Sequence, residues 1–203
     1  MRTTIVARTR PGMFAWKPEW PVDSGFPRSV CSGHNGPMPV DRRTFFQIMS
    51  AFPTGVAIVT TLEPDGPPRG LTTNAVTSVS ADPPILLICI DRDSRTLPAL
   101  RATRRFVVNF MRDDHAEICE LFASKADDKF ADVAWTPGLE GVPILHEGAI
   151  AHAECVTLEE LEIGDHVVVT GRVEAGDGPA PDDVPIVWFR RGFSSAQAPE
   201  PSV

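Results

Sequence analysis

The chain has 203 residues, of which 42% are hydrophobic and 23% charged, and its formal net charge is -8 at pH 7. These values are typical of a globular protein with a sizeable core, and the acidic balance argues against nucleic acid as a partner because it would repel the phosphates. No apolar run approaches the roughly 20 residues that a membrane-spanning helix needs. The N-terminus lacks the apolar region of a secretory signal, and the four cysteines are scattered. We therefore expect a cytoplasmic protein with no membrane partner and no structural disulfide.

The two ends of the chain differ in composition from its middle. Residues 1–39 are rich in Pro, Gly, Ser and Arg and have no sustained period of 2 or 3.6, which is typical of a poorly ordered extension. An alternative is that translation begins at Met38, directly before the first well-formed helix. We expect one folded domain over residues 40–194 and a tail rich in Ser, Ala and Pro over residues 195–203.

A capped helix is expected to open the folded part of the chain. Asp41 can cap a helix over residues 42–51, and Pro53-Thr54-Gly55 ends it. A second, short helix is expected over residues 94–102, with Ser94 as its cap. A third follows Asp113 or Asp114 as its cap. The apolar face of the first helix carries Phe45, Ile48, Met49 and Phe52, and that of the third carries Ala116, Ile118, Leu121 and Phe122.

Runs of β-branched and apolar residues predict about seven strands. The first two flank the turn Glu63-Pro64-Asp65-Gly66, in which Pro fixes φ and Asp-Gly tolerates left-handed geometry. Strands that alternate irregularly with short helices indicate an α+β, mainly β fold of the Greek-key barrel type, whereas a Rossmann sheet needs regular alternation. The expected strands cover residues 55–62, 69–74, 84–90, 105–111, 150–163, 165–174 and 184–189, whereas residues 75–80 alternate only loosely.

The most informative stretch is GLTTNAVTSVS, from Gly70 to Ser80. It carries the amide of Asn74 and the hydroxyls of Thr72, Thr73, Thr77, Ser78 and Ser80. Hydroxyls and exposed backbone N–H groups at a strand end can hold a phosphate or the polar edge of a flavin without Lys or Arg. The same pattern also fits an edge strand whose polar residues face water, so this stretch alone leaves both interpretations open.

Together with other segments, this stretch resembles the flavin reductase family of two-component flavin-dependent monooxygenases. The resemblance covers about residues 41–193 in order and spacing, whereas residues 1–39 depart from the family pattern. The matching segments are PTGVAIVTT from Pro53 to Thr61, GLTTNAVTSVS, the turn Asp82-Pro83-Pro84, FVVNF from Phe106 to Phe110, and Gly164-Asp165-His166 with Gly171.

This resemblance implies a fold, an activity and partners. The fold would be an FMN-binding split β-barrel of the Greek-key type, forming a homodimer with flavin at the subunit interface. The activity would be NAD(P)H-dependent reduction of FMN or FAD by hydride transfer from nicotinamide to flavin N5. A separate flavin-dependent monooxygenase would receive the reduced flavin by diffusion. The sequence does not separate FMN from FAD, or NADH from NADPH.

The resemblance also implies which residues hold the flavin. The Pro-Thr-Gly turn would approach the flavin ring, and the polar stretch would hold the ring edge, ribityl chain and phosphate. The start of the short helix would bind phosphate, as helix N-termini do, and the FVVNF strand would lie along the flavin. The implied cofactor-binding residues are Pro53, Thr54, Gly55, Thr72, Thr73, Asn74, Ala75, Thr77, Ser78, Val79, Ser94, Thr96, Phe106, Val107 and Asn109.

His166 is the one catalytic candidate, because it would face the nicotinamide and position it or help with proton balance. A structural histidine, hydrogen-bonded at its turn, is the alternative. Two other functions stay open on the same barrel: a flavin-binding protein without turnover, and an oxidase with tightly bound FMN. No metal site is expected, because the helical pair His115 and Cys119 has no second pair of ligands nearby in sequence.

Overall fold

The computed structural model describes residues 40–196. The expected N-terminal extension and residues 197–203 lie outside this range, so the predicted domain boundaries remain predictions. Within the described range, no helix is long and apolar enough to cross a membrane.

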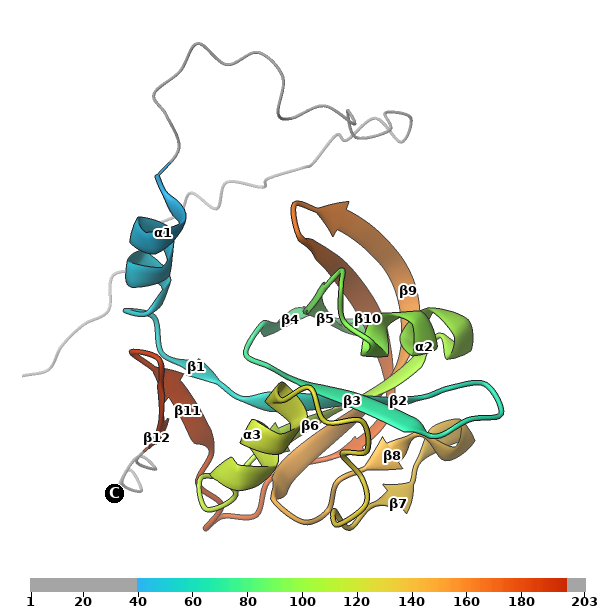
Figure 1. Cartoon of the computed structure of the whole chain (residues 1–203). Helices are drawn as coiled ribbons and strands as arrows, with labels where there is room; N and C mark the ends of the chain where they lie inside the picture. Colours follow the sequence, from blue (N-terminus) through green and yellow to red (C-terminus); the bar gives the residue numbers. More distant parts are fainter. Residues whose placement is uncertain (1–39, 197–203) are drawn as a thin grey trace, which may run out of the picture. The chain divides into compact units, whose positions relative to one another are not determined.

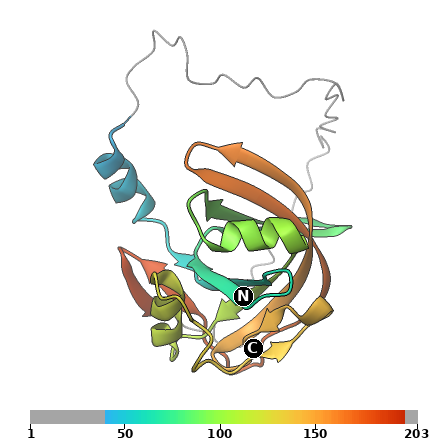
Figure 2. The ribbon, with the colours of Figure 1, turned by 45° about the vertical axis from the view of Figure 1, so that its right-hand side comes forward.

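A seven-stranded antiparallel sheet dominates residues 40–196, with the strand order β3-β2-β6-β9-β10-β5-β4 (Figure 1). Strands β3 and β4 follow one another in sequence yet form the two edges, so the barrel is open between them. The long β9–β10 hairpin curves around helix α2 (Figure 2). The predicted mainly β split barrel is confirmed. Its strands are β2 (Ala57–Leu62), β3 (Pro68–Thr73), β4 (Val76–Ala81), β5 (Pro84–Asp91), β6 (Arg105–Met111), β9 (Ala149–Ile163) and β10 (His166–Asp177).

Strand β2 is buried on both faces, which explains its unbroken apolar and β-branched sequence. Ala57 and Val59 face a hydrophobic cluster inside the barrel, where Leu97 and Leu100 of α2 (Thr96–Thr103) also pack. Val56, just before the strand, and Ile58 within it face a second cluster under helix α3 (Ala116–Ala123). Successive side chains of a strand point to opposite faces, so alternate residues of this one run pack in two different cores.

Helix α3 lies close to strand β3 because Gly70 has no side chain. A Cβ at Gly70 would lie 2.6 Å from Cε1 of Phe122, a buried α3 residue. The predicted caps of α3 were wrong: its first turn follows His115, and no side chain caps it. The predicted cap of α2 was also wrong by one residue, because Arg95 holds the N-cap position while Ser94 precedes it.

Helix α1 (Arg42–Met49) has the predicted cap, since Asp41 Oδ1 accepts a hydrogen bond of 2.7 Å from the Thr44 N–H. None of its residues is buried within the described part of the chain. Its apolar face thus meets solvent or a partner rather than the barrel core: Phe45, Ile48 and Met49, with Phe52 just beyond the helix, are 50%, 57%, 47% and 63% exposed.

Sequence reasoning missed four short strands and one 3-10 helix. Two of the missed strands complete a small sheet in which β1 (Thr54–Gly55) pairs with β11 (Ile186–Phe189) and β11 with β12 (Gly192–Ser195). The other two pair with each other near the 3-10 helix Leu139–Gly141: β7 (Thr136–Pro137) and β8 (Pro143–Ile144). Elements of two to four residues carry too little periodicity to be recognised in a sequence.

Candidate functional site

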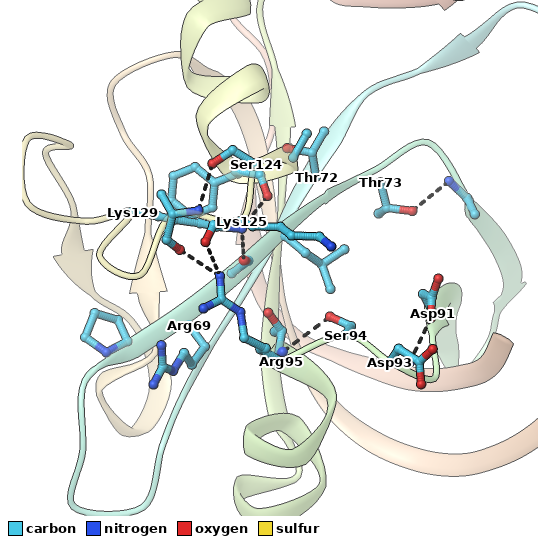
Figure 3. A pocket seen from close by; sticks show the side chains of 18 of the residues that line it. Arg69, Thr72, Thr73, Asp91, Asp93, Ser94, Arg95, Ser124, Lys125 and Lys129 are labelled. Carbon is cyan, nitrogen blue, oxygen red and sulfur yellow. Dashed lines mark hydrogen bonds between the residues drawn. The ribbon is translucent and has the colours of Figure 1, made fainter. Parts of the chain in front are cut away.

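A groove of about 760 Å³ lies beside edge strand β3, near the opening of the barrel (Figure 3). One wall is β3 with the Asn74-Ala75 link that leads to β4. The opposite wall is the turn of residues 91–96 before α2, and the segment of residues 122–130 closes a third side. His166, the first residue of β10, also lines it. The volume falls within the range of about 300–1,000 Å³ typical of cofactor sites.

Hydroxyl groups on two walls face this groove. Thr73 Oγ1 accepts a hydrogen bond of 3.0 Å from the Ala75 N–H, and Ser94 Oγ accepts one of 3.3 Å from the Thr96 N–H. Each hydroxyl thereby fixes its own turn and keeps its proton available for an acceptor in the groove. Thr72 differs, because its hydroxyl donates to the carbonyl of Cys119 at 2.6 Å and so attaches β3 to α3.

The Pro53-Thr54-Gly55 turn is connected to the rim of the groove by one hydrogen bond. Asn74 Nδ2 donates to Thr54 Oγ1 at 3.1 Å. Thr54 itself belongs to β1, and neither Pro53 nor Gly55 lines the groove. The turn therefore flanks the site rather than forming its wall.

Basic side chains are the main feature of this site that sequence reasoning missed. Arg69 and Lys125 line the groove, as do Arg95 and Lys129. Arg95 holds the 125–127 segment, since it donates to the carbonyls of Lys125 and Ala126 at 2.7 and 2.9 Å and to Asp127 Oδ1 at 2.7 Å. The sequence feature that could have indicated these basic groups is the pair Lys125 and Lys129, in the polar segment directly after α3.

Lys129 joins α3 to β3 at the base of the groove. Its ammonium donates to the carbonyl of Phe122 at 2.6 Å and to that of Gly70 at 3.3 Å. Burial, followed by the charge of nearby Arg95, lowers the pKa of Lys129 below its usual value. These contacts hold the segment of residues 122–130, which also contains Lys125, against β3.

His166 extends into the groove from a rigid strand end. It pairs with Asp91 of β5 in the sheet register, and its side chain is 46% exposed. Nδ1 lies 2.8 Å from Asp165 Oδ1, and this hydrogen bond is the main reason why the pKa of Asp165 is lowered. The bond orients the ring, and Nε2 has no partner among residues 40–196, so it is free to contact a ligand.

The predicted FVVNF contacts lie away from the groove. Phe106 and Val107 are 1% exposed and pack in two hydrophobic clusters. Asn109 is fully buried: its amide donates to the Ile58 carbonyl at 3.0 Å and accepts from the Leu145 N–H at 2.8 Å. These three side chains support the barrel wall instead of presenting a surface to the groove.

Strand β4 carries the rest of the predicted contacts. Thr77, Ser78 and Val79 are exposed, but they do not line the groove. Val79 lies at a bulge, since the pairing with β5 shifts between Ser78 and Ser80. The bulge explains why this stretch alternates so loosely in the sequence.

The three cysteines in the described part of the chain differ in burial. Cys119 and Cys155 are buried, and burial raises the pKa of each thiol to about 12. Cys89 differs, because it is half-buried and lines the groove. Burial also raises its pKa, so the thiol is protonated at neutral pH.

These groups suit a flat molecule that carries a phosphate. Leu71, Ala75, Cys89 and Phe122 supply an apolar floor, while hydroxyls and basic groups can bind an anion. A half-exposed histidine at one end is placed to contact a second planar group. Fold and groove together define a mainly β split barrel with an open groove of the kind that holds a ligand.

Comparison with known proteins identifies the family. Residues 49–197 match the family described as flavin reductase like domain, and this chain belongs to it. It is 48% identical over 157 residues to a flavin reductase (NADH) of Kitasatospora aureofaciens, covering 76% of this chain and 82% of that protein. It is 33% identical to the reductase subunit HsaB of a flavin-dependent monooxygenase of Mycobacterium tuberculosis, covering 78% of this chain and 84% of that one.

A solved structure is similar over most of its length. The NADH:FAD oxidoreductase SgcE6 of Streptomyces globisporus C-1027, solved with NAD and FAD fragments, has a TM-score of 0.73 and 33% identity. The alignment covers 80% of this chain and 96% of that structure.

Proposed function

We propose that this protein is an NAD(P)H:flavin oxidoreductase that supplies reduced FMN or FAD to a separate flavin-dependent monooxygenase. The observation that carries the proposal is the groove itself. Hydroxyl and basic groups and the half-exposed His166 line one open site, in a chain that belongs to the flavin reductase-like family. A flavin and a nicotinamide in contact would supply a hydride acceptor and a hydride donor to this site.

The proposed roles of the residues follow from their positions. The hydroxyls of Thr73 and Ser94, with the guanidinium of Arg69, hold the phosphate and the ribityl chain of the flavin. Leu71 and Cys89 support the flavin ring from the apolar floor. His166 contacts the nicotinamide through its free Nε2 and keeps the nucleotide in position for hydride transfer.

Release of the reduced flavin fits the openness of the site. A cofactor that must leave after each turnover needs a groove with solvent access rather than an enclosed cavity. One relative is the reductase subunit of a flavin-dependent monooxygenase, which is the kind of partner that the proposal requires. The reduced flavin would reach that partner by diffusion.

A homodimer is part of the proposal. The apolar side chains of α1 are exposed, and so is Val79 on the edge strand β4, at 53%. Two copies related by a two-fold axis would bury such faces against each other, which is the commonest form of assembly. Light scattering at micromolar concentration is expected to give twice the monomer mass, and a monomer mass would contradict the dimer. The free thiols of Cys89, Cys119 and Cys155 support a reducing, cytoplasmic location.

The test is an anaerobic stopped-flow measurement with purified protein, FMN or FAD, and NADH or NADPH. Rapid bleaching of several equivalents of added flavin is expected, with little flavin retained by the protein after dialysis. No bleaching with either nucleotide would contradict the proposal and favour a flavin-binding protein. Stoichiometric flavin that survives dialysis, with no stimulation by added flavin, would favour an oxidase with tightly bound FMN.

A further inference from the structure

A short surface segment, residues 124–128, borders the groove directly after helix α3 and is called the flap below (Figure 3). Residues 124–127 line the groove. All five residues lie outside the helices and strands, and all but Ala126 are exposed. The flap therefore has little packing of its own, and its position depends on the contacts that the rest of the chain makes with it.

Both ends of the flap are fixed to the core. Phe122 precedes it and Phe130 follows it, and the two buried rings meet edge-to-face at 5.0 Å and 87°. The Lys129 ammonium adds hydrogen bonds to the carbonyls of Phe122 and Gly70. The middle of the flap can therefore move without disturbing the core, because packing fixes only its ends.

Arg95 holds the middle of the flap from the opposite side of the groove. Its Nη2 donates to the carbonyls of Lys125 and Ala126 at 2.7 and 2.9 Å, and its Nη1 donates to Asp127 Oδ1 at 2.7 Å (Figure 3). One guanidinium thus binds three consecutive residues, which its planar fork of donors permits. Within residues 40–196, no other residue outside the flap forms a hydrogen bond with Lys125, Ala126 or Asp127.

The connection between Arg95 and the flap has one rigid end and one exposed end. The backbone of Arg95 holds the N-cap position of α2, between Ser94 and the buried Thr96. Its side chain is 50% exposed, and that of Asp127 is 97% exposed. Ion pairs exposed to this extent are weak, so the connection can break and form again while the fold stays intact.

We propose that Arg95 is a positioning residue that holds the flap closed beside a flavin in the groove and thereby sets how long the flavin stays bound. The closed flap keeps Lys125 at the groove and covers one of its sides. Breaking of the Arg95 bonds opens that side, and the flavin leaves. The inference rests on the proposed function for the occupant of the groove. An enzyme that passes its flavin to a partner must release it after each turnover, and release is often the slow step.

The first test needs no ligand, because it measures the flap itself. Trypsin cleaves after lysine in exposed and mobile loops, so the bond between Lys125 and Ala126 reports on opening of the flap. Limited proteolysis of the full chain, followed by mass spectrometry at this bond, compares the wild type with Arg95→Met. Loss of the three hydrogen bonds is expected to raise the cleavage rate about tenfold. An unchanged rate in a folded variant would overturn the proposal.

The second test measures the release of oxidised FMN with no nucleotide present. Stopped-flow dilution of the FMN-loaded protein, followed by flavin fluorescence, gives the dissociation rate. Arg95→Met is expected to raise this rate about tenfold, with little change in the association rate. The KM for FMN should rise accordingly, whereas the rate of hydride transfer to bound FMN in a single anaerobic turnover should stay the same.

This release measurement separates the inference from the proposed function, because it needs no turnover. Faster release from Arg95→Met would support the role of the flap even if neither NADH nor NADPH reduced the flavin. Unchanged release from a folded Arg95→Met protein would overturn that role, even if the wild type reduced flavin normally. A wild type that binds no FMN would overturn it as well.

Two further variants test whether Arg95 acts through the flap or directly on the ligand. Arg95→Lys keeps the positive charge beside the groove but loses the fork of donors, so it should resemble Arg95→Met in both tests. Wild-type behaviour of Arg95→Lys would overturn the proposal. Asp127→Ala removes one of the three bonds and is expected to speed release about twofold. Slower release from Asp127→Ala would mean that the freed Arg95 binds the flavin itself, which would also overturn the proposal.

Arg101 is the matched control on the same helix. It forms ion pairs with Glu160 at 2.8 Å and with Glu162 at 3.2 Å, and it does not line the groove. Arg101→Met is expected to leave both the cleavage after Lys125 and the release of FMN unchanged. An acceleration equal to that of Arg95→Met would overturn the proposal, because loss of any arginine of this region would then loosen the protein. Melting temperatures of all variants identify changes that come from unfolding.

Discussion

In the seven-stranded sheet, the middle strand β2 and the edge strand β4 have the same length but differ in burial and in their role. Strand β2 has a hydrogen-bonded neighbour on each side, and its residues up to Thr61 are buried. Strand β4 has one neighbour, and its residues are half-buried or exposed. The middle strands therefore carry most of the unfolding free energy. The two edge strands each have one backbone edge without a neighbouring strand, and the groove lies beside one of them, β3.

The largest effect is expected from a core substitution that separates these two roles. Phe106 was a candidate flavin contact, yet it is 1% exposed inside the barrel. Phe106→Ala is expected to lower the free energy of unfolding by about 3–5 kcal/mol, because it leaves a cavity. In thermal unfolding this corresponds to a drop on the order of 10 °C. Normal stability with lost flavin binding would contradict the assignment of Phe106 to the core.

The next effect concerns His166 at the groove. His166→Ala is expected to lower kcat/KM for NADH on the order of 10²-fold, because the nicotinamide loses a positioning contact, while the flavin Kd changes little. The chain offers a matched control in His115. That residue forms the same bond to its preceding aspartate, 2.7 Å from Nδ1 to Asp114 Oδ1, but does not line the groove. His115→Ala should retain kcat/KM. A lower melting temperature with near-normal kinetics in His166→Ala would support the structural alternative.

A smaller effect is expected in the reactivity of the Cys89 thiol, because Cys89 lines the groove. In a Cys31→Ser background, Cys89 is expected to react with a disulfide reagent more than tenfold faster than Cys119 or Cys155, whose pKa values of about 12 keep them as thiols. The pKa of Cys89 is also raised, so its thiolate is scarce at pH 7 and its rate should rise as the pH increases through 9. Saturating FMN should slow the reaction. Equal labelling of all three thiols, or no protection by FMN, would contradict this description.

The smallest effect is expected from deletion of residues 1–39. The three hydrophobic clusters of the described chain are all formed by residues 56 and beyond, and the first helix has its own cap at Asp41. Thermal unfolding of the truncated protein is expected to remain cooperative at nearly the same temperature. Loss of the cooperative transition would show that this extension is part of the fold.

The sequence predicted the long strands well because each has a strong local signal. Strands β2 and β6 are uninterrupted runs of β-branched and apolar residues, and β9 and β10 flank a Gly-Asp turn in which Gly164 has φ 60°. The fold class followed from these elements and their spacing. Helix caps were less predictable, because Asp113, Asp114 and Ser94 all satisfy the composition rule without holding the cap position.

A minority of the residues that line the groove were predictable from the sequence. The Thr72–Ala75 segment, Ser94, Thr96 and His166 all line the groove, and the motifs had indicated them. Lys125 and Arg95 were missed, because a charged residue in a loop gives no local sign of the wall it will join. Asn109 shows the opposite error: it belongs to the right motif, but its amide is used by the backbone of β2 and by Leu145. Motifs locate a strand, whereas tertiary packing decides which of its side chains reach the ligand.

The most direct test of the proposed flavin site is amide hydrogen exchange of the wild type with and without saturating FMN. We predict that FMN protects residues 68–76, 91–96 and 122–130, the three walls of the groove, while β2 and β6 exchange slowly in both states. Protection elsewhere, with these three segments unchanged by FMN, would contradict the assignment of the groove between the sheet edge and α3 as the flavin site.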